Sequence, residues 1–176
     1  MPNYIYIATS LDGFIARKDR SIDWLLEIPN PETSDFGFSD FISTIDAIVM
    51  GRKTYESVLT FGAWPYNKPV FVLSNTLQSI PQYLSDKVEI IKGSPELVVN
   101  TLNARKYKNL YIDGGKTIQS FLKENFIDEI IITKVPILLG EGIPLFGELV
   151  REQKFAHLKT EVLFNYLVKS HYKKIN

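Results

Sequence analysis

The chain has 176 residues, enough for one domain with a substantial core, and we expect a single domain over residues 1–176. Hydrophobic residues make up 45% and charged residues 23%, a globular composition that excludes collagen-like, low-complexity and disordered classes. Lysine and arginine total 20 and aspartate and glutamate also total 20, so no overall positive field exists to attract nucleic acid or an anionic membrane.

Cysteine is absent and histidine occurs twice, which excludes disulfides, thiolate zinc sites and cysteine nucleophiles. We therefore expect no metal site. No run approaches the roughly 20 apolar residues of a membrane span, and the first residues lack a secretory leader pattern. We expect a cytoplasmic protein that binds neither membrane nor nucleic acid.

Short apolar runs rich in β-branched residues alternate with helical patterns along the chain. The predicted strands are residues 4–8, 46–50, 69–73, 88–91, 109–113 and 128–133. Helices are predicted around residues 35–45 and 54–59, from Ser94 with Pro95 in its first turn, and along 118–122. This alternation predicts an α/β domain with a largely parallel sheet.

The last 20 residues differ from this pattern. Residues 157–162 and 166–172, joined by Phe164 and Asn165, predict an antiparallel hairpin at the sheet edge.

Two strand-to-helix junctions carry glycine, at residues 50–54 and 112–117. Glycine allows close backbone approach to a ligand, and a helix start supplies unpaired N–H groups, a combination that suits phosphate. Each junction alone is also explained by the conformational need of a tight turn. Two of them in one small domain, both ending in a basic residue and threonine, fit a diphosphate held between two helix starts.

Two common nucleotide motifs fail at specific positions. A P-loop ending at residues 115–117 requires glycine where Leu110 stands. The glycines at 140 and 142 begin a dinucleotide fingerprint, but Leu145 occupies the place of its third glycine. The sequence therefore disfavours a classical Rossmann domain.

Longer motifs carry a family resemblance. Residues 49–57 closely resemble the cofactor motif of dihydrofolate reductases, and residues 73–75 and 112–115 follow in that family's order. Residues 8–13 and 138–146 are similar to the reductase domain of the bifunctional riboflavin-pathway deaminase/reductase, which shares the fold. The chain resembles a stand-alone member of this superfamily, which implies a three-layer α/β/α fold with a mixed, largely parallel central sheet.

The resemblance implies NADPH as the hydride donor, lying across the ends of the central strands. The residues that it assigns to the cofactor are Ala8, Gly51, Arg52, Lys53, Thr54, Leu73, Ser74, Asn75, Lys92, Asp113, Gly114, Gly115, Lys116 and Thr117. A cationic or hydroxyl-rich site is what a preference for the phosphorylated cofactor requires. The alternative for Arg52 and Lys53 is a solvated first helical turn.

The resemblance also provides two candidate catalytic carboxylates. Asp35 precedes Gly51 by the interval at which dihydrofolate reductases carry the carboxylate that binds the pterin ring. Its alternative is an exposed helix N-cap. Asp12 matches the aspartate that riboflavin-pathway reductases present to substrate, and its alternative is a simple Asp-Gly turn.

On the substrate side, Trp24 and Phe38 are candidates for lining the ring pocket, with core packing as the alternative, and Glu141 is assigned to the substrate by the resemblance. We expect an NADPH-dependent reductase of a pteridine or pyrimidine-type ring, similar to dihydrofolate reductase or to 5-amino-6-(5-phosphoribosylamino)uracil reductase. The alternative is an NADP(H)-binding module without reductase activity.

We also expect a homodimer, because the riboflavin-pathway relatives pair and because residues 130–139 are very apolar for a strand at a sheet edge. The alternative for residues 130–139 is an interior strand.

Overall fold

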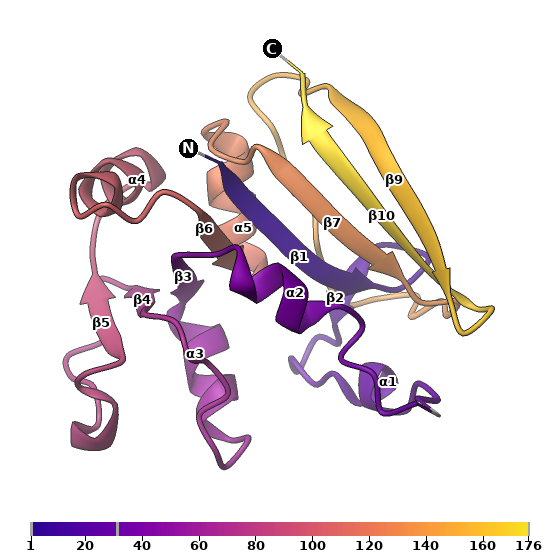
Figure 1. Ribbon diagram of the computed structural model, residues 1–176, viewed down its shortest axis with the longest axis horizontal. Helices are drawn as coiled ribbons and strands as arrows, with labels where there is room; N and C mark the ends of the chain where they lie inside the picture. Colours follow the sequence, from indigo (N-terminus) through magenta and orange to yellow (C-terminus); the bar gives the residue numbers. More distant parts are fainter. Residues whose placement is uncertain (1, 31, 176) are drawn as a thin grey trace.

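The computed structural model describes residues 2–30 and 32–175, and a single eight-stranded sheet organises it. Six mutually parallel strands form its main part: β1 (Asn3–Thr9), β3 (Ala47–Gly51), β4 (Val70–Leu73), β5 (Val88–Ile91), β6 (Leu110–Asp113) and β7 (Glu129–Lys134). An antiparallel hairpin of β9 (Phe155–Leu163) and β10 (Leu167–Lys174) completes it. The order is β5-β4-β3-β6-β1-β7-β10-β9 (Figure 1), and the predicted mixed sheet is confirmed.

Helices cover both faces of this sheet. They are α1 (Asp23–Leu26), α2 (Phe38–Ser43), α3 (Arg52–Leu59), α4 (Pro95–Ala104) and α5 (Gly115–Lys123), with a short 3-10 helix, η1 (Gln82–Leu84). Alternate strand residues point to opposite faces, so Val49 packs with α4 and α5 while Met50 packs with α2 and α3. In Figure 1, α2 lies in front of the sheet and α5 behind it. The three-layer α/β/α prediction is confirmed.

Local signals explain several element boundaries. Ser94 caps α4 by accepting a hydrogen bond from the Leu97 N–H at 3.3 Å, and Pro95 begins that helix. Phe164 and Asn165 both have positive φ, at 52° and 63°, as the two central residues of a tight hairpin turn require. Within the described residues, no helix combines the length and apolar character needed to cross a membrane.

The apolar segment at residues 130–139 is not at an edge. Its first part belongs to β7, which pairs with β1 on one side and β10 on the other. The expectation of an apolar edge is therefore wrong, and the interior-strand alternative is correct. The predicted homodimer loses this support and depends on the family resemblance alone.

A second, two-stranded sheet was not predicted. Strand β2 (Phe14–Ala16) pairs antiparallel with β8 (Ile143–Pro144), joining two loops that are far apart in the sequence. This small ribbon lies close to the beginning of α5, where its contacts bear on the candidate site.

Candidate functional site

The two glycine turns lie against each other. Gly51 ends β3 and Gly114 follows β6, and because these strands are neighbours in the sheet, α3 and α5 begin side by side. A Cβ added to Gly114 would lie 2.2 Å from Thr54 Oγ1, and one added to Gly51 would lie 2.6 Å from Thr117 Oγ1. Each glycine thus accommodates the threonine of the other turn, a reciprocal contact that holds the two helix starts together.

Both helix starts leave backbone donors available. Within the described residues, neither α3 nor α5 receives a side-chain cap, and the residues before them are Gly51 and Gly114. Gly114 has φ of 90°, a conformation that favours glycine. The first N–H groups of a helix have no partner inside it and carry the positive end of the helix dipole. Two such helix ends side by side offer backbone donors of the kind that bind anions, at the place where the sequence predicts a diphosphate.

Polar residues also follow the carboxyl ends of the neighbouring strands. Gly51 lies opposite Leu73, and Leu73 opposite Ile91, so three parallel strands end in register. The residues that directly follow these ends are Arg52, Ser74 and Lys92. A guanidinium, a hydroxyl and an ammonium are therefore placed in a row at the carboxyl ends of adjacent strands, the place where open α/β sheets bind ligands.

Thr76, which was not predicted as a site residue, contacts two residues of this row, Arg52 and Ser74. The Arg52 guanidinium donates to Thr76 Oγ1 at 3.0 Å and to Glu56 at 2.6 Å. The buried Ser74 hydroxyl accepts from the N–H groups of Thr76 and Leu77, at 3.2 and 3.0 Å. The side chains of the remaining cationic and amide candidates extend into solvent, namely Lys53, Asn75, Lys92 and Lys116. The row therefore combines one hydrogen-bonded guanidinium with several exposed polar side chains.

Asp113 ends β6, directly before Gly114 of the second glycine turn. Its Oδ1 accepts a hydrogen bond from the Gly114 N–H at 2.8 Å. Burial raises the pKa of the Asp113 carboxyl to about 6. The buried Tyr111, two residues earlier on the same face of β6, donates its hydroxyl to the Tyr6 carbonyl oxygen at 3.0 Å. A weakly acidic carboxyl beside an anion-binding edge is a candidate for proton chemistry.

Asp12 joins two loops. Its carboxylate accepts hydrogen bonds from Ser10 Oγ at 2.5 Å, Gly140 N at 2.7 Å and Leu139 N at 3.2 Å. The Ser10 hydroxyl is the main cause of a lowered Asp12 pKa, followed by the two backbone donors. These contacts tie the loop after β1 to the loop before β8, a structural role that goes beyond the simple Asp-Gly turn of the alternative.

Asp35 is exposed and lies just before α2, where it binds backbone N–H groups. Its carboxylate accepts from Gly37 N at 2.9 Å and Ser39 N at 2.8 Å, and the hydrogen bonds with Ser39 lower its pKa. Since Gly37 is the residue that caps α2, Asp35 satisfies donors of the first turn from two residues earlier. The structure thus shows the capping geometry that was its alternative.

The three substrate candidates lie in different surroundings. Trp24 is 3% exposed and packs with Val135 and Leu167, a cluster that also contacts Ala8. Its indole N–H has no hydrogen-bond partner among the described residues. Phe38 packs edge-on against Tyr6 and Tyr111, with centroid distances of 5.8 and 6.3 Å.

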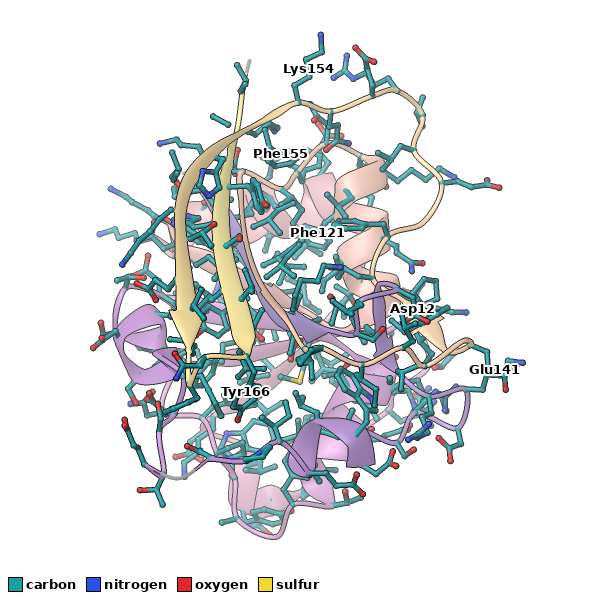
Figure 2. The ribbon with its side chains drawn as sticks, turned by 90° about the vertical axis from the view of Figure 1, so that its right-hand side faces the viewer. Asp12, Phe121, Glu141, Lys154, Phe155 and Tyr166 are labelled. Atoms are coloured by element: carbon teal, nitrogen blue, oxygen red, sulfur yellow. The ribbon has the colours of Figure 1, made fainter. Side chains whose placement is uncertain are left out.

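Glu141 does not converge with these aromatics. It is exposed and pairs with Lys18, and Figure 2 shows it on the outermost part of its loop, farther out than Asp12.

The β2–β8 ribbon packs onto the second glycine turn. A Cβ added to Gly115 would lie 2.9 Å from Ile15 Cδ1 and 3.2 Å from Ile143 Cγ2. The small residue at this position is therefore needed for packing within the chain, in addition to any ligand. Sequence patterns did not identify Ile15 and Ile143, because two very short strands carry no readable periodicity.

A separate groove of about 370 Å³ lies between α2 and the β9–β10 hairpin. It is lined by Tyr4, Tyr6, Phe41, Glu129, Lys169 and His171, among others. None of the predicted site residues lines it. Among residues 2–30 and 32–175, no group of three or more histidine, aspartate and glutamate side chains is arranged to hold a metal ion.

Comparisons with known proteins agree with this architecture. The chain is 41% identical to the uncharacterized protein YwjB of Bacillus subtilis (strain 168) over 171 residues, which cover 96% of this chain and 95% of YwjB. It superimposes with a TM-score of 0.96 on a protein of Shewanella sp. PV-4 named for riboflavin biosynthesis, at 50% identity and over the full length of both chains.

The fold is also that of a larger, bifunctional enzyme. The diaminohydroxyphosphoribosylaminopyrimidine deaminase/5-amino-6-(5-phosphoribosylamino)uracil reductase of Thermotoga maritima superimposes with a TM-score of 0.75 at 15% identity. The match covers 99% of this chain and 56% of that enzyme. The model of the RibD C-terminal domain matches residues 4–168. The chain therefore belongs to the RibD C-terminal domain family.

Proposed function

We propose that this protein is an NADPH-dependent reductase that transfers a hydride to a C=N or C=C bond of a pteridine or pyrimidine-type ring. The observation that carries the proposal is the pair of uncapped helix starts, held together by reciprocal glycine–threonine contacts at the carboxyl edge of the sheet. Membership of a family that includes reductase domains of riboflavin biosynthesis supports it.

The residues of this edge fit a phosphorylated dinucleotide. The backbone donors at the starts of α3 and α5 would hold the diphosphate, which requires no further cation there. Arg52, Ser74, Thr76 and Lys92 would surround the ribose phosphate, where two cations and two hydroxyls match a dianion. The nicotinamide would lie toward Ala8 and Asp113, at the ends of neighbouring strands β1 and β6.

A bound nicotinamide supplies the hydride, and the chain supplies position and environment. Phe38 and Tyr111 would provide an aromatic wall on the α2 face of the sheet. Two buried polar atoms at this end of β1, Trp24 Nε1 and Thr9 Oγ1, have no hydrogen-bond partner within the described residues. Such groups carry a desolvation cost unless a ring heteroatom or water satisfies them, which suits a polar heterocycle.

Binding and turnover are tested separately. Calorimetry should show micromolar or tighter binding of NADPH and at least tenfold weaker binding of NADH, a difference of about 1.4 kcal/mol or more. Loss of NADPH absorbance should then be measured with dihydrofolate and with the ribosylated aminouracil. Equal affinity for both cofactors would contradict the phosphate site. Binding without oxidation of NADPH by either ring would favour the alternative, a binding module without reductase activity.

A further inference from the structure

The first turn of α3 carries charges of the wrong sign for helix stability. Arg52 and Lys53 are its first two residues, and no acidic residue occurs in that turn. Cations at a helix N-terminus face the positive end of the helix dipole, which is unfavourable. The stability of α3 therefore does not explain why two cations stand there, whereas an anionic ligand at this edge of the sheet does.

Glu56, one turn later on the same side of α3, binds both cations. Its Oε1 accepts a hydrogen bond from Arg52 Nε at 2.6 Å, and its Oε2 lies 3.5 Å from Lys53 Nζ. The hydrogen bond from Arg52 is the main cause of a lowered Glu56 pKa, so this carboxyl is ionised near neutral pH. One carboxylate thus orders two cations that would otherwise repel each other.

A second contact ties Arg52 to the neighbouring strand. Its Nη1 donates to Thr76 Oγ1 at 3.0 Å, and the Thr76 N–H donates to the buried Ser74 hydroxyl at 3.2 Å. Ser74 directly follows β4, which ends in register with β3. A guanidinium has five N–H donors, and the contacts with Glu56 and Thr76 use two of them. Three donors remain, enough for a phosphate to bind in a bidentate manner.

We propose that Glu56 is a positioning residue for the ribose phosphate of the cofactor, an inference that rests on the proposed NADPH-dependent function. Glu56 acts through Arg52, whose guanidinium it fixes in place before the cofactor binds. A long, flexible side chain that is already ordered loses less freedom when it binds a ligand. The preference for the phosphorylated cofactor therefore depends on Glu56 as well as on the cations.

Two substitutions separate this role from the charge of Glu56. The carboxylate orders Arg52, but its negative charge also repels a phosphate. Glu56→Gln removes the charge and keeps an amide oxygen that can accept the Arg52 hydrogen bond, whereas Glu56→Ala removes both. The difference between these two variants therefore measures the positioning of Arg52 without the effect of the charge.

The first test measures the order of Arg52 and needs no cofactor. In nitrogen-15 relaxation experiments on the whole protein, the Arg52 Nε–H signal, identified by its loss in Arg52→Leu, should have a high order parameter in wild type and in Glu56→Gln. It should be low in Glu56→Ala. Arg17 is an internal control, because its Nε donates to Asp23 at 2.7 Å and should stay ordered in every variant. Equal order of Arg52 in Glu56→Ala and Glu56→Gln would overturn the proposal.

The second test measures phosphate binding by calorimetry with two adenosine probes that carry no nicotinamide. Adenosine 2′,5′-bisphosphate contains the ribose phosphate, and adenosine 5′-monophosphate lacks it. Glu56→Ala should bind the bisphosphate about threefold to tenfold more weakly than Glu56→Gln, and both variants should bind the monophosphate equally. Asp23→Ala removes a carboxylate from an arginine pair of similar exposure on α1 and should bind both probes as wild type does.

The outcomes distinguish this inference from the function on which it rests. Equal affinity of Glu56→Ala and Glu56→Gln for the bisphosphate would overturn the positioning role, and the phosphate site would stand if the wild-type protein still preferred the bisphosphate to the monophosphate. A wild-type protein that bound the two probes equally would overturn both the positioning role and the preference for a phosphorylated cofactor.

Discussion

Replacing Gly114 with alanine should destabilise the fold by about 2–5 kcal/mol, because the added methyl group is unfavourable both for the backbone conformation and for packing. The left-handed φ of 90° costs an L-residue about 1–2 kcal/mol. The new Cβ would also lie 2.2 Å from Thr54 Oγ1 and 3.2 Å from Thr54 Cβ, and overpacking of this kind costs about 1–3 kcal/mol. A domain of this size has a total stability of only about 5–15 kcal/mol, so the loss should be easily measured.

Gly62 provides a matched control. Its φ is 87°, yet a Cβ there would meet nothing within 4 Å, so Gly62→Ala should cost only the conformational term of about 1–2 kcal/mol. Urea unfolding followed by the fluorescence of the two tryptophans gives both values. When Thr54→Ala is added to Gly114→Ala, most of the stability lost through the Cβ–Thr54 contact should be restored. Adding Thr54→Ala to Gly62→Ala should restore no stability. Equal losses in the two alanine variants would refute the contact between the helix starts.

Four further outcomes are expected. Arg52→Leu should weaken NADPH binding several-fold and leave NADH binding nearly unchanged, as calorimetry with both cofactors would show. Asp12→Asn should speed hydrogen exchange at Leu139 and Gly140 while the sheet stays protected, since the amide replaces one acceptor oxygen with a donor. Light scattering should report twice the 20.1 kDa chain mass if the homodimer prediction is correct, and a single chain mass would contradict it. Burial raises the pKa of Asp113 from the usual 3.8 of an aspartate to about 6, so its proton stabilises the fold below about pH 4 and this contribution disappears as pH rises through 6. Asp113→Asn should therefore gain up to about 3 kcal/mol relative to wild type at pH 8, a gain that urea unfolding should find absent at pH 4.

The parallel sheet was predictable because its signals are local. Each of the six central strands is a short β-branched run, and Ser94 with Pro95 marks the start of α4 by its own hydrogen bonding. The location of residues 130–139 was not predictable from composition. A continuous apolar run looks the same at a sheet edge and between two strands, and here β7 pairs with β10, a strand that begins more than thirty residues later.

The candidate site was predictable at the level of the backbone turns. The glycines at 51 and 114 identify both helix starts. Few residues other than glycine tolerate a turn with an unusual backbone conformation or with another side chain packed closely against the backbone. The sequence did not show that each glycine accommodates a threonine of the other turn. It also did not identify Thr76, whose hydroxyl binds Arg52 only because β3 and β4 end in register.

The carboxylates show why site chemistry is harder to predict than site position. Asp12 owes its ionised state in part to N–H groups 127 and 128 residues away along the chain, which no local motif records. Asp35 is held ionised by donors within four residues, so its capping role was visible as an alternative. Asp113 stands in a motif that suggests only a cofactor turn, but burial in the folded chain weakens its acidity. The proton affinity of a carboxyl depends on the balance between donors and desolvation, and that balance is set by tertiary neighbours. A motif can therefore place a carboxylate in a site, while its role as acid, anchor or cap is decided by what the fold brings against it.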